Sequence, residues 1–261
     1  MRTRFILMGA ILFALPALTF ADACAAGTVA SVVGQTCTIG DLTFDFTSYL
    51  PYSNDADATG FGATQVTFTP IAGGFELSGD FSAVYNAGQS YEVYGQGALY
   101  YSVLSGAGGL NAAGDSLSGA SLTTNPSSCC LSDYTYAFAL VENSVYSEGV
   151  FTSSKPNQYQ YYGQSANYND AGSSSEAFAA TPTVSGTAVV EASAVSEYAT
   201  SAGYYVDGGS GTASGSFTSA DFTFSEAPAA VPEPTSILLL ASAALALMGT
   251  LRRWTVVERK R

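Results

Sequence analysis

Three groups of side chains in this chain can do chemistry: its cysteines, its carboxylates and its tyrosines. Histidine is absent from all 261 residues, which excludes Ser-His-Asp and Cys-His catalysis and every zinc site with a histidine ligand. Lysine and arginine total 8 against 21 aspartates and glutamates, for a formal net charge of −13. This balance excludes a nucleic-acid-binding protein, because such proteins need a dense basic surface.

The four cysteines form two pairs along the sequence. Cys24 and Cys37 lie 13 residues apart around a glycine-containing loop, whereas Cys129 and Cys130 are adjacent. In an exported chain, four cysteines allow three complete disulfide connectivities. We expect a Cys24–Cys37 bridge that pins the mature N-terminus, while Cys129 and Cys130 can bond each other or two distant partners. A metal–thiolate site is less favoured, because such sites use spaced cysteines and usually histidine.

One carboxylate spacing suggests a metal ligand set. Asn54, Asp55 and Asp57 bring oxygen atoms close together, as a calcium loop does, but the glycine and the closing glutamate of an EF-hand are missing. Asp55 and Asp57 are therefore a weak calcium candidate, and a solvated turn is the favoured interpretation. Glycosidase chemistry needs two carboxylates about 5 to 9.5 Å apart across a cleft. No motif surrounds any carboxylate pair, so the sequence predicts a protein that is not an enzyme and has no cofactor.

Tyrosine is concentrated in two stretches, and exposed tyrosines can stack on sugar rings. The clustered residues are Tyr91, Tyr94, Tyr100 and Tyr101, and then Tyr159, Tyr161, Tyr162 and Tyr168. Packing between neighbouring strands selects the same alternation, and it is the favoured explanation. Threonine is scattered and forms no regular array, so the sequence does not indicate ice binding.

The elements that must position these side chains are strands. Apolar and polar residues alternate with period two in several segments, a pattern typical of strands with one buried face. These segments begin at Leu42, Thr64, Phe75, Tyr91, Tyr134, Val184 and Phe217. Turn residues separate them, including a predicted turn at Asn111–Asp115. With no long helical stretch and no fixed-period repeat, the sequence predicts an all-β antiparallel sandwich, jelly-roll-like rather than a barrel.

The N-terminus has the three parts of a secretory signal peptide. Arg2 and Arg4 form the positive region, residues 5–18 are apolar, and small residues suited to cleavage lie around Ala21. The sequence therefore predicts export, with the signal peptide at residues 1–21.

The C-terminus has a second hydrophobic segment. No charged residue occurs from Pro234 to Leu251, and the basic pair Arg252 and Arg253 follows. Eighteen uncharged residues are just enough for a transmembrane helix. The positive-inside rule places the basic tail in the cytoplasm and the acidic body outside.

The segment before this span carries a motif. Val231, Pro232, Glu233 and Pro234, followed by the apolar span and by Arg252 and Arg253, resemble the PEP-CTERM sorting signal of Gram-negative bacteria, also named the ice-binding protein C-terminal domain. The resemblance implies a transient inner-membrane anchor that is recognised at Pro-Glu-Pro by an exosortase, a membrane cysteine transpeptidase. It also implies that the protein is then cut near the motif and passed to the cell envelope or to the exopolysaccharide.

We therefore expect a signal peptide at 1–21, a β-sandwich body at 22–224, a linker at 225–230 and a sorting signal at 231–261. Residues 22–230, the body with its linker, have 19 acidic residues and one basic residue, Lys155, because only Glu233 and Glu258 lie outside this range. The first hypothesis is a non-catalytic structural or adhesive protein of the cell surface or biofilm matrix, with an exosortase and extracellular polysaccharide as partners. The alternative is a secreted carbohydrate-binding module or glycoside hydrolase.

Overall fold

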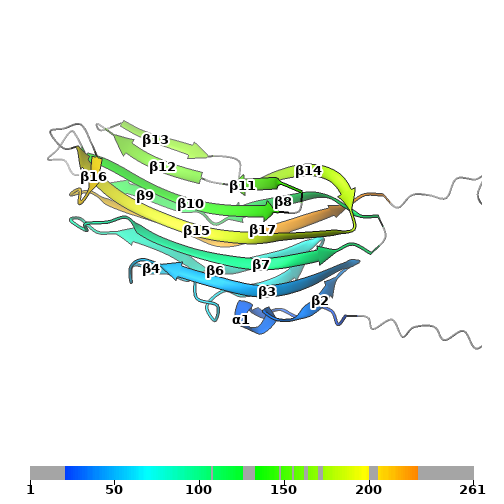
Figure 1. The fold of residues 1–261 in the computed structure, drawn as a ribbon. Helices are drawn as coiled ribbons and strands as arrows, with labels where there is room; N and C mark the ends of the chain where they lie inside the picture. Colours follow the sequence, from blue (N-terminus) through cyan, green and yellow to red (C-terminus); the bar gives the residue numbers. More distant parts are fainter. Residues whose placement is uncertain are drawn as a thin grey trace, which may run out of the picture.

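Two antiparallel β-sheets pack face to face in this protein (Figure 1). The computed structural model describes residues 21–106, 108–125, 133–146, 148–154, 156–161, 164–169, 173–199 and 205–228. Within these residues, strands β1 to β17 are accompanied by a single four-residue helix, α1 (Val29–Val32). The prediction of an all-β antiparallel sandwich is confirmed.

The eight-stranded sheet has the order β1–β5–β6–β17–β8–β14, with β4 beside β6 and β9 beside β17. Its strands are β1 (Gly27–Thr28), β4 (Ala58–Thr59), β5 (Thr67–Ile71), β6 (Gly74–Tyr85), β8 (Leu110–Ser118), β9 (Ser121–Asn125), β14 (Ser173–Thr181) and β17 (Thr212–Glu226).

The nine-stranded sheet has the order β13–β12–β10–β15–β7–β3–β2, with β11 beside β10 and β16 beside β15. Its strands are β2 (Thr36–Ile39), β3 (Leu42–Ser53), β7 (Val93–Leu104), β10 (Asp133–Val145), β11 (Val150–Ser154), β12 (Pro156–Tyr161), β13 (Gln164–Asn169), β15 (Thr183–Ala199) and β16 (Tyr205–Asp207).

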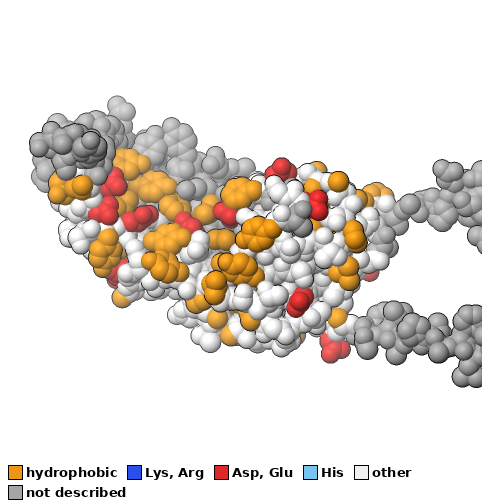
Figure 2. All heavy atoms as spheres, in the orientation of Figure 1, with side chains coloured by type: hydrophobic (Ala, Val, Ile, Leu, Met, Phe, Trp, Pro, Cys, Tyr) orange, Lys and Arg blue, Asp and Glu red, His pale blue; other side chains and the backbone are white. Residues whose placement is uncertain are grey.

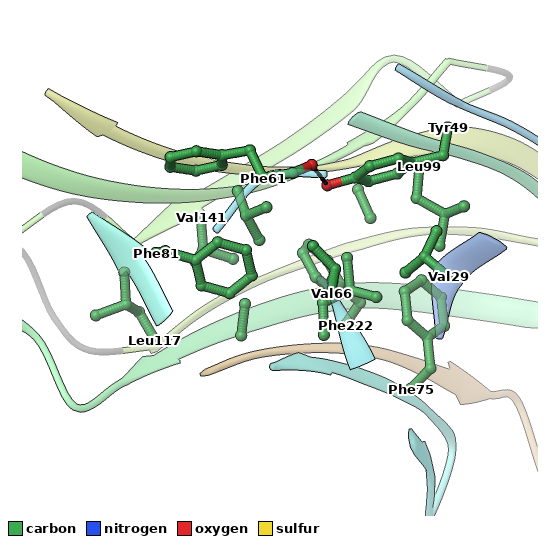
Figure 3. Packing of buried hydrophobic residues seen from close by; sticks show 14 of the residues in the cluster. Val29, Tyr49, Phe61, Val66, Phe75, Phe81, Leu99, Leu117, Val141 and Phe222 are labelled. Atoms are coloured by element: carbon green, nitrogen blue, oxygen red, sulfur yellow. Dashed lines mark hydrogen bonds between the residues drawn. The ribbon is translucent and has the colours of Figure 1, made fainter. Parts of the chain in front are cut away.

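Phenylalanine rings fill much of the space between the sheets (Figure 3). Phe44 and Phe46 of β3, Phe75 of β6 and Phe222 of β17 are all fully buried. The Phe75 ring centroid lies 5.4 Å from that of Phe46 and 5.3 Å from that of Phe222. Each such ring pair adds about 0.5–1.5 kcal/mol to the burial of its apolar surface. The period-two pattern that begins at Leu42 therefore identifies core residues correctly in the first half of β3.

The predicted turn at Asn111–Asp115 is wrong, because these residues lie inside β8. This strand is hydrogen-bonded to β17 on one side and to β14 on the other. Asp115 is only 3 % exposed, and a Cβ atom at Gly114 would come within 3.0 Å of the Ser174 carbonyl oxygen. Pairing on both sides overrides the local turn propensity of Asn, Gly and Asp.

A bulge in β3 decides which of its residues face outward. Leu42, Phe44 and Phe46 are buried, but the register with β7 shifts between Phe46 and Ser48. The buried position therefore moves to Tyr49, and Tyr52 is 55 % exposed. One extra residue in a strand exchanges the two faces for everything that follows it.

The predicted disulfide between Cys24 and Cys37 is confirmed. The two Cα atoms lie 4.8 Å apart, and the Cys24 N–H donates to the Thr38 carbonyl oxygen at 2.9 Å. The bridge ties the start of the body to β2, at the border of the nine-stranded sheet.

Both ends of the described chain lie at the same end of the sandwich, which we call the anchor end (Figure 1). Ala23 bridges to Thr38 of β2, and the Ser105 hydroxyl after β7 donates to Glu226 at the end of β17 at 2.6 Å. The opposite end, where β3 ends at Ser53 and β7 begins at Val93, is the distal end.

The last strand, β17, continues to Glu226, two residues beyond the predicted end of the body. Residues 1–20, Cys129, Cys130 and the sorting motif with its apolar span and basic pair lie outside the described residues. Within the part of the chain that the structure describes, no helix has the length and hydropathy to cross a membrane.

Candidate binding site at the distal end

Aromatic side chains lie on the outer face of the nine-stranded sheet, near the distal end. Gln96 of β7 lies opposite Tyr52 of β3 on one side and Glu191 of β15 on the other. One pleat further along, Tyr94 lies opposite Ser193, which in turn lies opposite Phe138 of β10. Residues opposite one another in a ladder share a face. We define the outer patch as Tyr52, Tyr94, Gln96, Tyr136, Phe138 and Glu191.

The rings of this patch are in contact. The centroids of Tyr52 and Tyr94 are 5.7 Å apart, and those of Tyr136 and Phe138 are 5.3 Å apart. Figure 2 shows apolar and aromatic side chains together with acidic ones over this half of the sheet. No described residue is lysine or arginine, so the visible charge is entirely negative.

Glu191 fixes the orientation of two neighbours in the patch. It is 8 % exposed, and its Oε2 accepts hydrogen bonds from the Tyr94 hydroxyl at 3.1 Å and from Gln96 Nε2 at 3.2 Å. Burial, followed by the charge of Glu191 and its hydrogen bond, holds the pKa of Tyr94 well above its usual value. Tyr94 therefore stays protonated and remains a donor, which holds its ring in place beside Tyr52.

A pocket of about 350 Å³ adjoins the outer patch, between β3 and the loop that follows β4. We call it the β3-edge pocket. Its lining residues are Pro51, Tyr52, Ser53, Ala58, Thr59, Gly60, Phe61, Gly62 and Gln65. Tyr52 belongs to both the pocket and the patch, so the two form one continuous site. None of the lining residues is acidic.

The far wall of the pocket is anchored in the core. The Tyr49 hydroxyl donates to the Phe61 carbonyl oxygen at 2.8 Å, which Figure 3 shows as a dashed line. The Phe61 ring, 3 % exposed, lies against Gly95 of β7 so closely that a Cβ atom there would overlap it. Gln65 Oε1 accepts from the Gly62 N–H at 3.1 Å. These contacts give the loop a fixed shape without any help from a ligand.

The near wall is the free edge of β3. The Asn54 N–H donates to the Tyr94 carbonyl oxygen at 3.1 Å, so by alternation the backbone of Tyr52 also faces β7. The backbone groups of Pro51 and Ser53 consequently face the pocket. Proline has no N–H to leave unpaired at such an edge, whereas the carbonyl groups and the Ser53 N–H are available to a polar ligand.

Three loops at the distal end are joined by hydrogen bonds near this site. Asn54 Nδ2 donates to the Glu92 carbonyl oxygen at 2.5 Å, and its Oδ1 accepts from the Tyr94 N–H at 2.8 Å. The Glu92 N–H donates to Asp207 at 3.2 Å, and the Ser193 hydroxyl donates to the Glu92 carboxylate. The strands that carry the outer patch are thereby held together at their ends.

Asp55 and Asp57, the weak calcium candidate, bind protein groups in this same region. Asp55 accepts from the Tyr91 hydroxyl at 2.5 Å and from the Asp57 N–H at 2.9 Å, and the Tyr91 hydrogen bond holds the pKa of Asp55 below its usual value. Asp57 accepts from Asn86 at 3.0 Å and from Gln89 at 3.2 Å. Within the described ranges, no three His, Cys, Asp or Glu side chains are grouped as metal ligands. The structure thus gives the pair a role in holding the loops.

The tyrosines of the first cluster lie in different environments. Tyr101 is buried in the core, where its hydroxyl donates to Asn143 at 2.5 Å, whereas Tyr91 is 45 % exposed and Tyr94 belongs to the outer patch. Of the second cluster, Tyr159, Tyr161 and Tyr168 lie in β12 and β13, and their side chains are outside the described part.

Sequence reasoning did not identify Tyr52, Phe61, Gln65 or Glu191 as site residues. For Tyr52 a signal exists, because proline precedes it in a strand pattern and proline indicates a free edge. Glu191 lies in an apolar run of β15, and a carboxylate there is a buried polar group that needs partners. Phe61 and Gln65 carry no local signal, since only the fold brings their loop to β3.

No protein family matches the sequence, and no curated protein matches it. Among solved structures, the chain is similar to TmCBM61 in complex with β-1,4-galactotriose, with 10 % identity and a TM-score of 0.25 over 69 % of this chain and 90 % of that one. It is also similar to a structure from work on the promiscuous specificity of carbohydrate-binding modules of the β-sandwich superfamily, with 8 % identity and a TM-score of 0.15 over 80 % of this chain and 64 % of that one. Likeness at this level transfers neither a ligand nor a site.

Proposed function

We propose that the chain is an exported, non-catalytic surface protein that binds polysaccharide through the outer patch and the β3-edge pocket. The observation that carries the proposal is the position of Tyr52, which is 55 % exposed, contacts Tyr94 and forms one wall of the pocket. A sugar ring presents apolar C–H faces and polar hydroxyl edges. Aromatic rings can stack on the apolar faces of a sugar, and nearby polar groups can form hydrogen bonds with its hydroxyl groups.

Binding rather than hydrolysis is supported by the composition of the pocket. Glycosidases place two carboxyl groups about 5 to 9.5 Å apart on either side of the scissile bond. No Asp or Glu lines the β3-edge pocket, and the nearby Glu191 already accepts hydrogen bonds from Tyr94 and Gln96. A sugar in the pocket would therefore be held without an acid–base pair.

The targeting part of the proposal rests on the sequence. Residues 1–21 would direct export, and the segment from Val231 to Arg253 would anchor the chain until an exosortase acts at Pro232–Pro234. The described chain enters and leaves the sandwich at the anchor end, while the candidate site lies toward the distal end. A membrane-anchored body would thus present its binding site away from the bilayer.

The test compares glycan binding by the exported protein and by a Tyr52→Ala variant. The probes are exopolysaccharide purified from the host, a neutral β-linked glucan and an anionic uronic acid polymer, each measured by calorimetry. We expect Tyr52→Ala to weaken binding by at least about tenfold, as the loss of one aromatic anchor typically does.

Tyr146→Ala is the matched control, because Tyr146 is 61 % exposed and follows β10 at the anchor end of the same sheet. It should bind like the wild type. Equal affinity of Tyr52→Ala and wild type, or the absence of binding to all three probes, would overturn the proposal.

A further inference from the structure

In the part of the chain that the structure describes, the outermost strand of the nine-stranded sheet, β13, is paired on one side alone. Among the described residues it pairs only with β12, from Pro156↔Asn169 to Tyr161↔Gln164. A strand in this position leaves a row of backbone N–H and C=O groups available to another strand.

The sequence of this hairpin is unlike the rest of the body. From Pro156 to Asn169 there is no charged residue, and glutamine, asparagine and tyrosine make up ten of the 14 positions. Short uncharged segments rich in such residues pair with copies of themselves, through ladders of amide side chains and stacked aromatic rings. Edge strands that avoid pairing usually carry charges, prolines or bulges, and β13 has no charge and no proline.

The opposite edge of the same sheet is protected. Strand β2 pairs with β3 only from Leu42 to Asp45. Among the described residues, the rest of β3 is unpaired on that side, and there the ring nitrogen of Pro51 faces the unpaired side. An incoming strand would find a donor missing there. The two edges are therefore not equivalent, and of these two, as far as the described residues show, β13 is the one open to a new strand.

The distribution of charge also favours β13 as the contact surface between two copies of the chain. Residues 22–230 carry 19 acidic residues and one basic residue, so two copies repel each other over most of their surfaces. The uncharged hairpin is where two copies can approach at the lowest electrostatic cost.

We propose that two copies of this chain pair antiparallel through their β13 strands, about a two-fold axis perpendicular to the sheet. Such a contact uses the same strand in both copies and closes at the dimer. Further growth at the opposite edge of this sheet would need the free half of β3, where Pro51 lacks a donor. The register places Tyr159 of β12 opposite Tyr136 of the outer patch, so the dimer brings two outer patches onto one side of a continuous sheet. Two linked sites on one polymer bind it more tightly than either site alone.

The test is the mass of the exported protein in solution, measured by sedimentation equilibrium over a range of concentrations. We expect a monomer–dimer equilibrium in the wild type. Ser165→Asp or Asn167→Asp would add one negative charge from each copy close to the two-fold axis, and each should weaken the dimer about fivefold or more. The matched control is Ser175→Asp in β14, an exposed position on an edge strand of the other sheet, which should dimerise like the wild type.

Measuring the dimer at high salt distinguishes two causes of weaker dimerisation in the variants, charge repulsion and loss of folded structure. At about 1 M salt the screening length falls to about 3 Å, so the two β13 variants should regain most of their dimer if they are folded. A wild type that stays monomeric, a Ser165→Asp variant that dimerises normally, or a Ser175→Asp variant that is equally impaired would overturn the proposal. Glycan binding by a monomeric variant would leave the polysaccharide function intact, so the two proposals fail separately.

Discussion

At the scale of single residues, two glycines of β7 make room for the aromatic side chains that support the site. A Cβ atom at Gly95 would overlap the Phe61 ring, and one at Gly97 would overlap the Tyr49 hydroxyl. Tyr49 and Phe61 are in turn joined by a hydrogen bond of 2.8 Å. Glycine in the middle of a strand weakens it, but it permits another group to approach closely. Here that group is the aromatic pair that anchors the pocket wall.

Gly97→Ala should therefore destabilise the protein by about 1–3 kcal/mol, the usual cost of overpacking a core. It should also weaken glycan binding, because Tyr49 must move and carries Phe61 with it. Gly79→Ala in β6 is the control, since its Cβ would meet its nearest neighbours at 3.5 Å, an ordinary contact. Equal unfolding midpoints in urea for the two variants would show that the close approach to Tyr49 is unimportant.

Glu142 of β10 gives the protein a pH-dependent stability. Burial raises its pKa above 4.5, the Ser144 hydroxyl at 2.8 Å opposes that shift, and the charge of Asp115 adds to it. Between 4.5 and this raised pKa, the folded protein keeps a proton that the unfolded chain has released. The contribution of Glu142 to the free energy of unfolding therefore falls as the pH rises through that window.

Glu142→Gln should remove this dependence. The variant should match the wild type in melting temperature near about pH 4, and should exceed it near about pH 7, where the wild-type carboxylate is charged. The measurement is thermal unfolding followed by circular dichroism at both pH values. An unchanged difference between the two proteins across this range would contradict the assignment.

At the scale of elements, the N-terminal segment depends on the bridge between Cys24 and Cys37. Besides the bridge, this segment is joined to the body by the short strand β1, by the four-residue helix α1 and by backbone hydrogen bonds to Thr38 of β2. Replacing both cysteines by serine should cost about 3 kcal/mol in the chain-entropy model for a loop of this length. Urea unfolding of the double variant checks this value. The wild type unfolded with a reducing agent should behave like the variant, and a wild type indifferent to reductant would argue against a stabilising role.

The bulge at Thr47 is the element-scale feature that creates the site. It shifts β3 by one residue against β7, so that Tyr49 enters the core and Tyr52 faces outward. A regular strand would bury Tyr52 and expose Tyr49. The aromatic contact of Tyr52 with Tyr94 and the hydrogen bond of Tyr49 to Phe61 both depend on this one residue.

At the scale of the whole molecule, the charge distribution and the positions of the ends bear on the export and anchoring proposed above. Seven of the eight basic residues lie in the terminal segments, before Ala21 or after Leu251. The acidic body repels anionic lipid surfaces. Because the described chain begins and ends at the anchor end, an anchored body can stand clear of the bilayer.

Processing should depend on Glu233. The flanking prolines favour an extended backbone, which would present this carboxylate to the exosortase. In a host with an exosortase, we expect Glu233→Ala to accumulate as a full-length precursor in the membrane fraction, measured by immunoblotting and mass spectrometry. Trimming and release at the wild-type rate would refute the sorting signal, and the tail would then act as a permanent anchor.

The sequence by itself determined the sandwich class, the core positions at the start of β3 and the Cys24–Cys37 bridge. Period-two burial and cysteine spacing are local properties, so they can be read without knowing which strands are neighbours. The tertiary structure alone decided that Asn111–Asp115 is a strand, that Tyr52 is exposed, that Phe61 contacts β3 and that Gln65 lines a pocket with β3. These outcomes depend on the pairing of β8 with β17 and β14, on the bulge in β3, and on β4 joining β6. Each is a contact between residues distant in the sequence, where pairing outweighs local propensity.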